Sequence, residues 1–121
     1  AHPPQRLLLR PSYDGDRALN SVEQLDPELN EWVALPSFMQ RRCSCCCVVL
    51  AGRLIVLGGV CGPMALNSVE YLDPSATEWR PGPAMSGFRS ACGAAVLNGR
   101  IYVAGGINGQ GVTLDTAEVF V

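Results

Sequence analysis

The segment Ala18–Pro27, with the sequence ALNSVEQLDP, returns 47 positions later as ALNSVEYLDP in Ala65–Pro74. The repeat runs without a gap over residues 18–59 and 65–106, and 21 of the 42 aligned pairs are identical. Such a period, built from short strand-like segments rather than helices, is typical of the stacked four-stranded units of a β-propeller. The repeat therefore predicts an all-β fold whose neighbouring units bury each other's faces.

Each period contains four extended segments separated by turn residues. The first is small and apolar throughout, as expected of a strand buried on both faces. A two-residue hairpin follows at Ala51-Gly52 and again at Asn98-Gly99, where a positive φ is required at both positions. A short fourth strand carries Trp32 or Trp79. The other predicted strands cover residues 20–25 in the first copy and 43–50, 53–57, 67–72, 90–97, 100–104 and 116–120 in the next two.

Glycine pairs end the second strand of the later copies, at Gly58-Gly59 and Gly105-Gly106. A missing Cβ allows a close backbone approach or an unusual φ at such places. The same offset aligns Leu7–Leu9 with Leu54–Val56 and places Pro11-Ser12 where a glycine pair would stand. We interpret the first copy as a divergent one.

The repeat predicts about two and a half to three four-stranded antiparallel blades of a propeller with an incomplete ring. We assign residues 1–36 to an incomplete blade, 37–83 to a complete blade and 84–121 to a second incomplete blade. Propellers close with about 4 to 8 blades, so the remaining blades are expected in a longer parent chain or in another copy. The start at Ala1 rather than Met also indicates a piece of a longer protein.

The composition argues against nucleic-acid and membrane partners. The formal net charge is −2 and the chain has no Lys, so it offers no cationic stripe for phosphates. Leu7–Leu9 is too short for a signal-peptide core, and no apolar run approaches the roughly 20 residues of a membrane helix.

The cysteines are expected to be reduced. Four of the six lie within Cys43–Cys47, where adjacent strand residues point to opposite faces and cannot readily pair. A free Cys packs as a small apolar residue. Because a disulfide framework is not expected, we predict a reducing, cytoplasmic compartment. No second cysteine pair at zinc-site spacing accompanies the run, so we predict no metal and no cofactor. Redox sensing stays open, because Arg41 and Arg42 precede Cys43 and a neighbouring cation lowers the pKa of a thiol.

Three glutamates, Glu23, Glu70 and Glu118, recur at one strand position and raise the question of a paired-carboxylate hydrolase. Acid and base catalysis needs two carboxyls that converge in unlike environments, whereas these lie on three different blades. We expect each to bind a nearby Arg. The sequence has no Ser-His-Asp set, phosphate-cradling glycine loop or dinucleotide fingerprint, so we predict no catalytic residues and no enzyme.

Together, the glycine pair, the Val-Glu-x-Leu-Asp-Pro segment, the Trp, the Pro and Met, and the Arg before a small-residue strand resemble the kelch repeat. The resemblance covers almost the whole chain. It implies propeller blades, commonly about six to a ring. It also implies a protein or peptide partner and, through domains outside this chain, the substrate-recognition role of BTB-kelch adaptors of cullin-RING ubiquitin ligases. Residues 1–121 contain no BTB or BACK segment.

Loops at one end of a propeller can form a binding face over a rigid scaffold. In kelch adaptors the Arg before the small-residue strand often lies at the pocket mouth, and it matches Arg42 and Arg89 here. The planar fork of an Arg suits a carboxylate, so the partner is expected to be acidic. If these side chains contact the partner, replacing both with Ala should weaken binding and leave thermal unfolding nearly unchanged. The alternative is that they only pin the loop to neighbouring carbonyls.

The predicted residues fall into two groups with different roles. The tryptophans and glycine pairs are interpreted as structural, since successive indoles fill the space between sheets. The predicted partner-binding residues are Arg42, Arg89, Arg41, Ser90, Tyr13, Asp14, Asn108 and Gln110.

Two other functions stay open. One is an actin-binding or cytoskeletal scaffold that uses the outer surface of the propeller. The other is an enzyme like the galactose oxidases, which are distant relatives of the kelch repeat; it requires histidine and tyrosine ligands, and the chain has one His.

Overall fold

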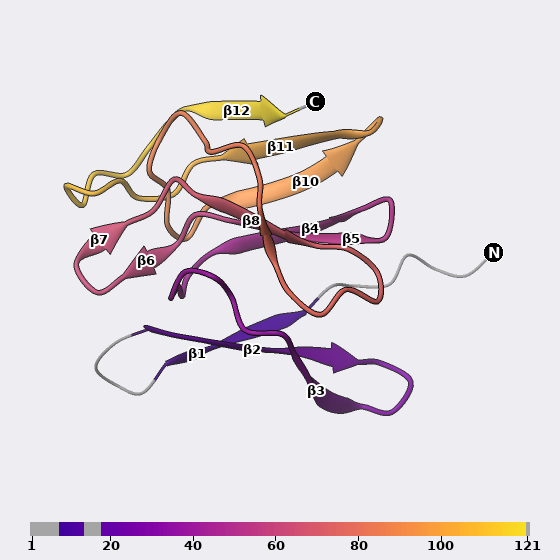
Figure 1. Cartoon of the computed structure of the whole chain (residues 1–121). Helices are drawn as coiled ribbons and strands as arrows, with labels where there is room; N and C mark the ends of the chain where they lie inside the picture. The colour runs from indigo at the N-terminus through magenta and orange to yellow at the C-terminus, as the bar shows by residue number, and fades with distance from the viewer. Residues whose placement is uncertain (1–7, 14–17, 121) are drawn as a thin grey trace.

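The computed structural model describes residues 8–13 and 18–120, and this part of the chain consists of strands, turns and loops without a helix. Three sheets stack on one another in the order of the sequence (Figure 1). The prediction of an all-β fold built from antiparallel propeller blades is confirmed. None of the described residues belongs to a helix that could cross a bilayer.

Each sheet is antiparallel and is built mainly from strands that follow one another along the chain. Blade 1 has the order β1 (Leu9–Tyr13), β2 (Ala18–Asp26) and β3 (Glu31–Leu35). Blade 2 has the order β4 (Cys46–Leu50), β5 (Arg53–Leu57), β8 (Val69–Leu72) and β9 (Arg80–Pro81). Blade 3 has the order β10 (Gly93–Leu97), β11 (Arg100–Ala104) and β12 (Ala117–Phe120). A small hairpin joins β5 to β8 and consists of β6 (Val60–Cys61) and β7 (Met64–Ala65).

Blade 2 contributes to two hydrophobic cores, one on each face. Along β5, Ile55 and Leu57 face blade 3 and Val56 faces blade 1, since successive strand residues point to opposite faces. The core between blades 2 and 3 comprises Cys46, Val48, Ile55, Leu57, Val69, Met85, Ile101 and Val103. The core between blades 1 and 2 comprises Val22, Phe38, Val56, Leu72 and Trp79. Each blade is therefore buried by its neighbours rather than by itself.

The two tryptophans differ in burial. Trp79 is 3% exposed, packs edge to face on Phe38 with ring centroids 5.0 Å apart, and donates from Nε1 to the carbonyl of Pro36 at 2.7 Å. Trp32 is 37% exposed, so the prediction that both are core residues is wrong for Trp32. Within the described residues no loop covers Trp32 as Pro36 covers Trp79, and the guanidinium of Arg10 lies over its ring instead, 4.1 Å from the centroid.

The strand register of blade 1 corrects the sequence alignment by one residue. The β1–β2 ladder pairs Leu9 with Gln24, and the β5–β8 ladder pairs Ile55 with Tyr71, the repeat equivalent of Gln24. Leu9 is therefore the counterpart of Ile55, one position away from the predicted alignment. Pro11-Ser12, predicted at the position of a glycine pair, lies inside β1. The gapless offset fails here because the first copy has a shorter connection between its strands.

Gly59 and Gly106 mark the places where the backbone admits no side chain. Their φ values are +101° and +91°, and a Cβ would lie 2.5 Å from the carbonyl oxygen of Cys43 and of Ser90, respectively. A Cβ on Gly58 would collide with the carbonyl of Arg89 in the next blade. The glycine pair thus permits the turn and, in blade 2, the close approach of blade 3.

The two predicted hairpin turns are confirmed and differ in cost. Ala51-Gly52 has φ values of +54° and +77°, and Asn98-Gly99 has +52° and +74°. Ala in this region is strained by roughly 1 kcal/mol, whereas Asn tolerates it. We expect Ala51→Asn to raise the free energy of unfolding in urea by up to about 1 kcal/mol, and the reverse change Asn98→Ala to lower it by a similar amount. No gain from Ala51→Asn would contradict the strain at this turn.

Candidate functional site: a groove between blades 2 and 3

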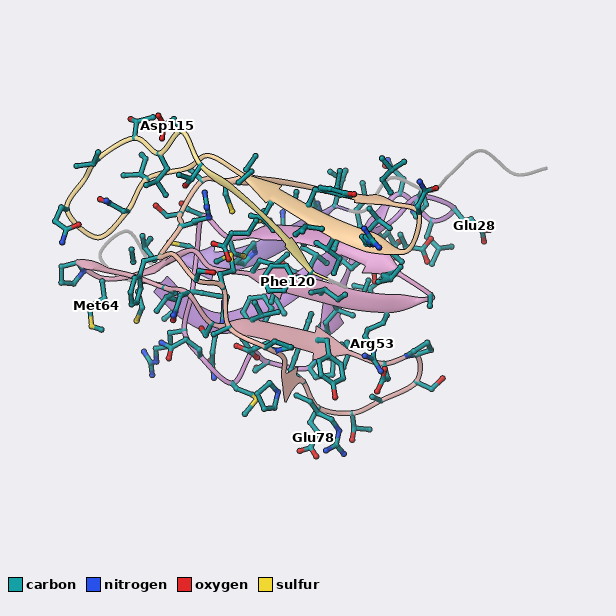
Figure 2. The ribbon with its side chains drawn as sticks, turned by 90° about the horizontal axis from the view of Figure 1, so that it is seen from above. Glu28, Arg53, Met64, Glu78, Asp115 and Phe120 are labelled. Carbon is teal, nitrogen blue, oxygen red and sulfur yellow. The ribbon has the colours of Figure 1, made fainter. Side chains whose placement is uncertain are left out.

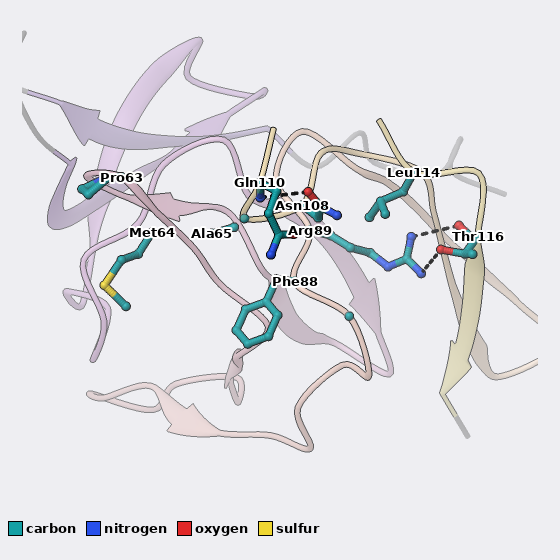
Figure 3. Close-up of a pocket in the computed structure, with 11 residues that line it drawn as sticks. Pro63, Met64, Ala65, Phe88, Arg89, Asn108, Gln110, Leu114 and Thr116 are labelled. Atoms are coloured by element: carbon teal, nitrogen blue, oxygen red, sulfur yellow. Dashed lines mark hydrogen bonds between the residues drawn. The ribbon is translucent and has the colours of Figure 1, made fainter. Parts of the chain in front are cut away.

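The strands have two ends, which carry different loops. Met64 and Asp115 lie at one end of the molecule, and Glu28 and Arg53 lie at the other (Figure 2). At the Met64 end a groove of about 520 Å³ opens between the β6–β7 hairpin, the segment that leads into blade 3 and the loop after β11 (Figure 3). Its lining comprises Pro63, Met64, Ala65, Gly87, Phe88, Arg89, Asn108, Gly109, Gln110, Leu114 and Thr116.

Arg89 forms the inner wall of the groove and is only 2% exposed. Its Nη1 donates to the carbonyls of Gly105 at 3.0 Å and Thr116 at 2.9 Å, and its Nη2 donates to Oγ1 of Thr116 at 3.0 Å. Its Nε donates to Oε2 of Glu118 at 3.1 Å. The guanidinium therefore holds the segment before blade 3 to the strand β12 of the same blade.

Glu118 completes this clamp from the other side. Its carboxylate accepts hydrogen bonds from the backbone N–H of Ser86 at 2.6 Å and of Gly87 at 3.0 Å. Burial raises the pKa of Glu118, but these two backbone donors and Arg89 outweigh it and hold the pKa below its ordinary value. The clamp is thus complete at neutral pH and weakens in acid, as the pH falls through this lowered pKa.

Blade 2 contains the same clamp, more deeply buried. Arg42 is 0% exposed, and its Nη1 donates to the carbonyls of Gly58 at 2.8 Å and Ser68 at 3.0 Å. Its Nη2 donates to Oε2 of Glu70 at 2.9 Å. Glu70 also accepts from the backbone N–H groups of two residues in the loop before β4, Met39 at 2.7 Å and Gln40 at 3.0 Å.

These contacts bear on the two interpretations of the arginines. The prediction that the repeated glutamates pair with Arg is confirmed, including the exposed pair of Arg10 and Glu23 at 2.7 Å. The guanidinium groups of Arg42 and Arg89 bind the chain's own carbonyls, hydroxyls and carboxylates, and of their nitrogens only Nε of Arg42 lacks a hydrogen-bond partner among the described residues. The geometry therefore supports the pinning role, and among the two only Arg89 lines the groove.

The residue before each buried Arg is exposed and differs between blades. This residue is Arg41 in blade 2 and Phe88 in blade 3, where it lines the groove with half of its surface in solvent. Phe88 was not among the residues predicted from the sequence to bind a partner. The signal that could have found it is variation between repeat equivalents next to invariant clamp residues, because a position without a structural role is free to carry function.

The other predicted binding residues lie at varied depths. Ser90 is buried, and its Oγ donates to the carbonyl of Ile107 at 3.3 Å. Asn108 lines the groove, but its Oδ1 accepts from the backbone N–H groups of Gln110 and Val112 and so shapes its own loop. Gln110 is exposed on the groove. Tyr13 ends β1 in blade 1 and is not among the residues that line the groove.

Asp14 lies outside the described residues. Arg41 is exposed but does not line the groove. Of the eight residues predicted to bind a partner, the structure therefore brings together Arg89, Asn108 and Gln110 at one site.

A second groove, of about 170 Å³, lies between β5, β8 and blade 3 and is apolar for a structural reason. Several of its lining residues are repeat equivalents of residues in the core around Trp79. These pairs are Val69 with Val22, Ile101 with Leu54 and Phe120 with Leu72. We assign this groove to blade packing rather than to ligand binding.

Among residues 8–13 and 18–120, no three His, Cys, Asp or Glu side chains gather around one point where they could hold a metal ion.

A family model described as the Kelch motif matches residues 13–39, 41–86 and 89–121, which together cover most of the chain. No curated protein matches the chain.

Proposed function

Because this chain belongs to the kelch-repeat family, we propose that it is the partner-binding part of a kelch propeller and that the groove between blades 2 and 3 holds a peptide or loop of another protein. The observation that carries the proposal is the exposed ring of Phe88, presented at the groove by a segment that Arg89 and Glu118 hold in place. A preformed site of this kind binds with little loss of conformational entropy.

The groove favours an apolar anchor flanked by hydrogen-bonding groups. Phe88 and Met64 are 51% and 65% exposed and both line the groove, so two large apolar side chains face solvent at one site. Gln110 adds amide groups at the rim. Arg89 is the only ionisable residue of the lining, and Glu118 offsets its charge. An acidic residue of the partner would therefore be met by the exposed Arg41 rather than by the groove itself.

We further propose that the parent protein is a non-enzymatic, intracellular adaptor that presents a substrate to a cullin-RING ubiquitin ligase through domains outside this chain. Its support is the resemblance to BTB-kelch propellers described above. The experiment is to express the parent protein in cells and to test for co-purification of a cullin. Loss of co-purification on deletion of the segment upstream of these repeats is the expected result, and a parent without any cullin contact would overturn this part of the proposal.

The groove itself can be tested with selected peptides. We expect peptides enriched from a displayed library on the intact chain to bind a Phe88→Ala, Met64→Ala double variant about 10- to 100-fold more weakly by isothermal titration calorimetry, since exposed anchors of an interface contribute most of its affinity. Both side chains are exposed, so the melting temperature should stay nearly unchanged.

The matched control for the double variant is Leu29→Ala, which removes a 63% exposed apolar side chain from the turn between β2 and β3, near Glu28 at the opposite end of the strands (Figure 2). It should leave peptide binding intact. Equal affinities for the double variant and the unchanged chain would place the binding face elsewhere.

Two alternatives are separated by simple measurements. A cytoskeletal scaffold predicts that the intact parent sediments with actin filaments, and that the Phe88 and Met64 changes have no effect on this. A galactose-oxidase-like enzyme predicts copper in the purified parent protein. Neither alternative explains the exposed anchor residues of the groove.

A further inference from the structure

Two cysteines from different blades meet where β4 of blade 2 lies beside β10 of blade 3. Cys46 begins β4 of blade 2, and Cys92 directly precedes β10 of blade 3. Their sulfur atoms lie 2.7 Å apart, and one thiol donates a hydrogen bond to the other. The backbone N–H of Ala91 donates to the carbonyl of Ser44 at 2.7 Å, which fixes the two strands next to the pair.

The strand alternation selects Cys46 from the run of cysteines. Cys45 and Cys47 pack against the core on the blade 1 side, whereas Cys46 belongs to the core shared with blade 3. Cys92 packs against that same core. The pairing was invisible to reasoning on neighbouring cysteines alone, because the two residues are 46 positions apart in sequence.

We propose that Cys46 and Cys92 are an oxidation site, at which a peroxide converts the two thiols into a disulfide that links blade 2 to blade 3. The proposal is independent of which partner occupies the groove.

The two thiols have different reactivity. The hydrogen bond from Cys46 lowers the pKa of Cys92 to about 7, against the effect of burial and with help from the charge of Arg89. The same hydrogen bond, together with burial, raises the pKa of Cys46. Burial raises the pKa of Cys45 to about 12. Cys92 is therefore the thiolate that reacts first near neutral pH.

The reaction balances in two steps. The thiolate of Cys92 attacks one oxygen of hydrogen peroxide, the O–O bond breaks, and Cys92 becomes a sulfenic acid while hydroxide leaves. The sulfur of Cys46 then attacks the sulfenic sulfur, the S–O bond breaks, and water leaves as the S–S bond forms. The hydroxide takes up the proton that Cys92 released on ionising, and the thiol proton of Cys46 leaves with the sulfenic oxygen as water. Two thiols thus lose two electrons in all and one peroxide becomes two waters.

The disulfide would restrain one wall of the groove. Cys92 follows Arg89 by three residues, so the disulfide would tie the segment that carries Phe88 to the inner strand of blade 2. A crosslink across 46 positions also restricts the unfolded chain, so the oxidised protein should melt about 5 to 15 °C higher than the reduced one.

The test is peptide mapping after mild oxidation of the intact chain with hydrogen peroxide. Trypsin cleaves after Arg and releases two peptides of interest, 43–53 and 90–100. The expected product is a linked pair of these peptides, about 2 Da lighter than their sum, whose fragmentation places the bridge at Cys46 and Cys92. Its formation should accelerate as the pH rises through about 7, where Cys92 ionises.

Two variants make the test decisive. Cys46→Ala should slow consumption of the Cys92 thiol about tenfold or more and abolish the linked peptide, because both the hydrogen bond and the resolving thiol are gone. Cys47→Ala, in the same strand but facing blade 1, should form the bridge like the unchanged chain. A bridge from Cys92 to Cys45 or Cys47, a link between two chains, or a Cys92 that reacts only after unfolding would each overturn the proposal.

Discussion

Replacement of Arg42 with Ala is expected to lower the free energy of unfolding by about 3 to 5 kcal/mol or to prevent folding altogether. Arg42 is 0% exposed and binds Glu70, Gly58 and Ser68, so the change leaves a buried carboxylate without its cation and two carbonyls without their donor. Urea unfolding followed by circular dichroism measures the loss.

Three variants make the result interpretable. Arg10→Ala removes an exposed ion pair with Glu23, the repeat equivalent of Glu70, and should cost no more than about 1 kcal/mol. Arg42→Lys keeps the charge but loses the planar fork, so its stability should fall between those of Arg42→Ala and the unchanged chain. Glu70→Gln removes the charge that pairs with Arg42, so the loop before β4 should be held less firmly than in the unchanged chain. An Arg42→Ala protein as stable as the unchanged chain would contradict the pinning role and restore Arg42 as a partner-binding residue.

This expectation follows from the pinning role, one of the two roles that the sequence left open for the arginines. If the arginines bound a partner, replacing them would weaken binding and leave the free energy of unfolding nearly unchanged. Because they are buried, we expect their replacement to lower the free energy of unfolding first. Any loss of binding in these variants would follow from loss of the folded loop, which the exposed Phe88 and Met64 variants are designed to avoid.

Replacement of Trp79 with Ala is expected to cost about 3 to 5 kcal/mol, since it opens a cavity between blades 1 and 2 and removes the hydrogen bond to Pro36. The repeat supplies its own control. Trp32 stands at the same repeat position in blade 1, but it is 37% exposed and the guanidinium of Arg10 lies over its ring, so Trp32→Ala should cost only about 1 kcal/mol.

The measurement is chemical denaturation of both variants, with the slope against denaturant compared to ensure that the transitions are alike. Trp79→Phe serves where Trp79→Ala fails to fold, and it should still destabilise more than Trp32→Phe because it loses the Pro36 hydrogen bond. Equal losses at the two positions would show that burial between blades does not set the contribution of the indole.

Part of the fold could be predicted from sequence because the repeat reports on local chemistry. The turns at Ala51-Gly52 and Asn98-Gly99 follow from which residues accept a positive φ, and the strands follow from short apolar segments between turns. The first copy was misaligned by one residue because loop length is not constrained by the pattern that constrains the strands. Strand register is set by hydrogen bonding between strands across the sheet, and the amino-acid sequence alone does not show which residues pair.

The candidate site was harder to predict because it depends on which side chains are buried and which are exposed. Arg42 and Arg89 were singled out for their type and position, yet whether a guanidinium faces solvent or the chain's own carbonyls depends on residues far away in sequence, such as Glu70 and Glu118. The same holds for Phe88, whose proposed role in partner binding rests on its exposure next to Arg89.

The sequence by itself determined the repeat, the strand content and the need for glycine at the blade ends, because these depend on the backbone preferences of neighbouring residues. Only the tertiary structure decided that Arg42 is buried, that Trp32 is not, and that Cys46 lies against Cys92. These outcomes depend on how one blade packs against the next, and blade packing is a property of residues about one repeat apart rather than of any segment alone.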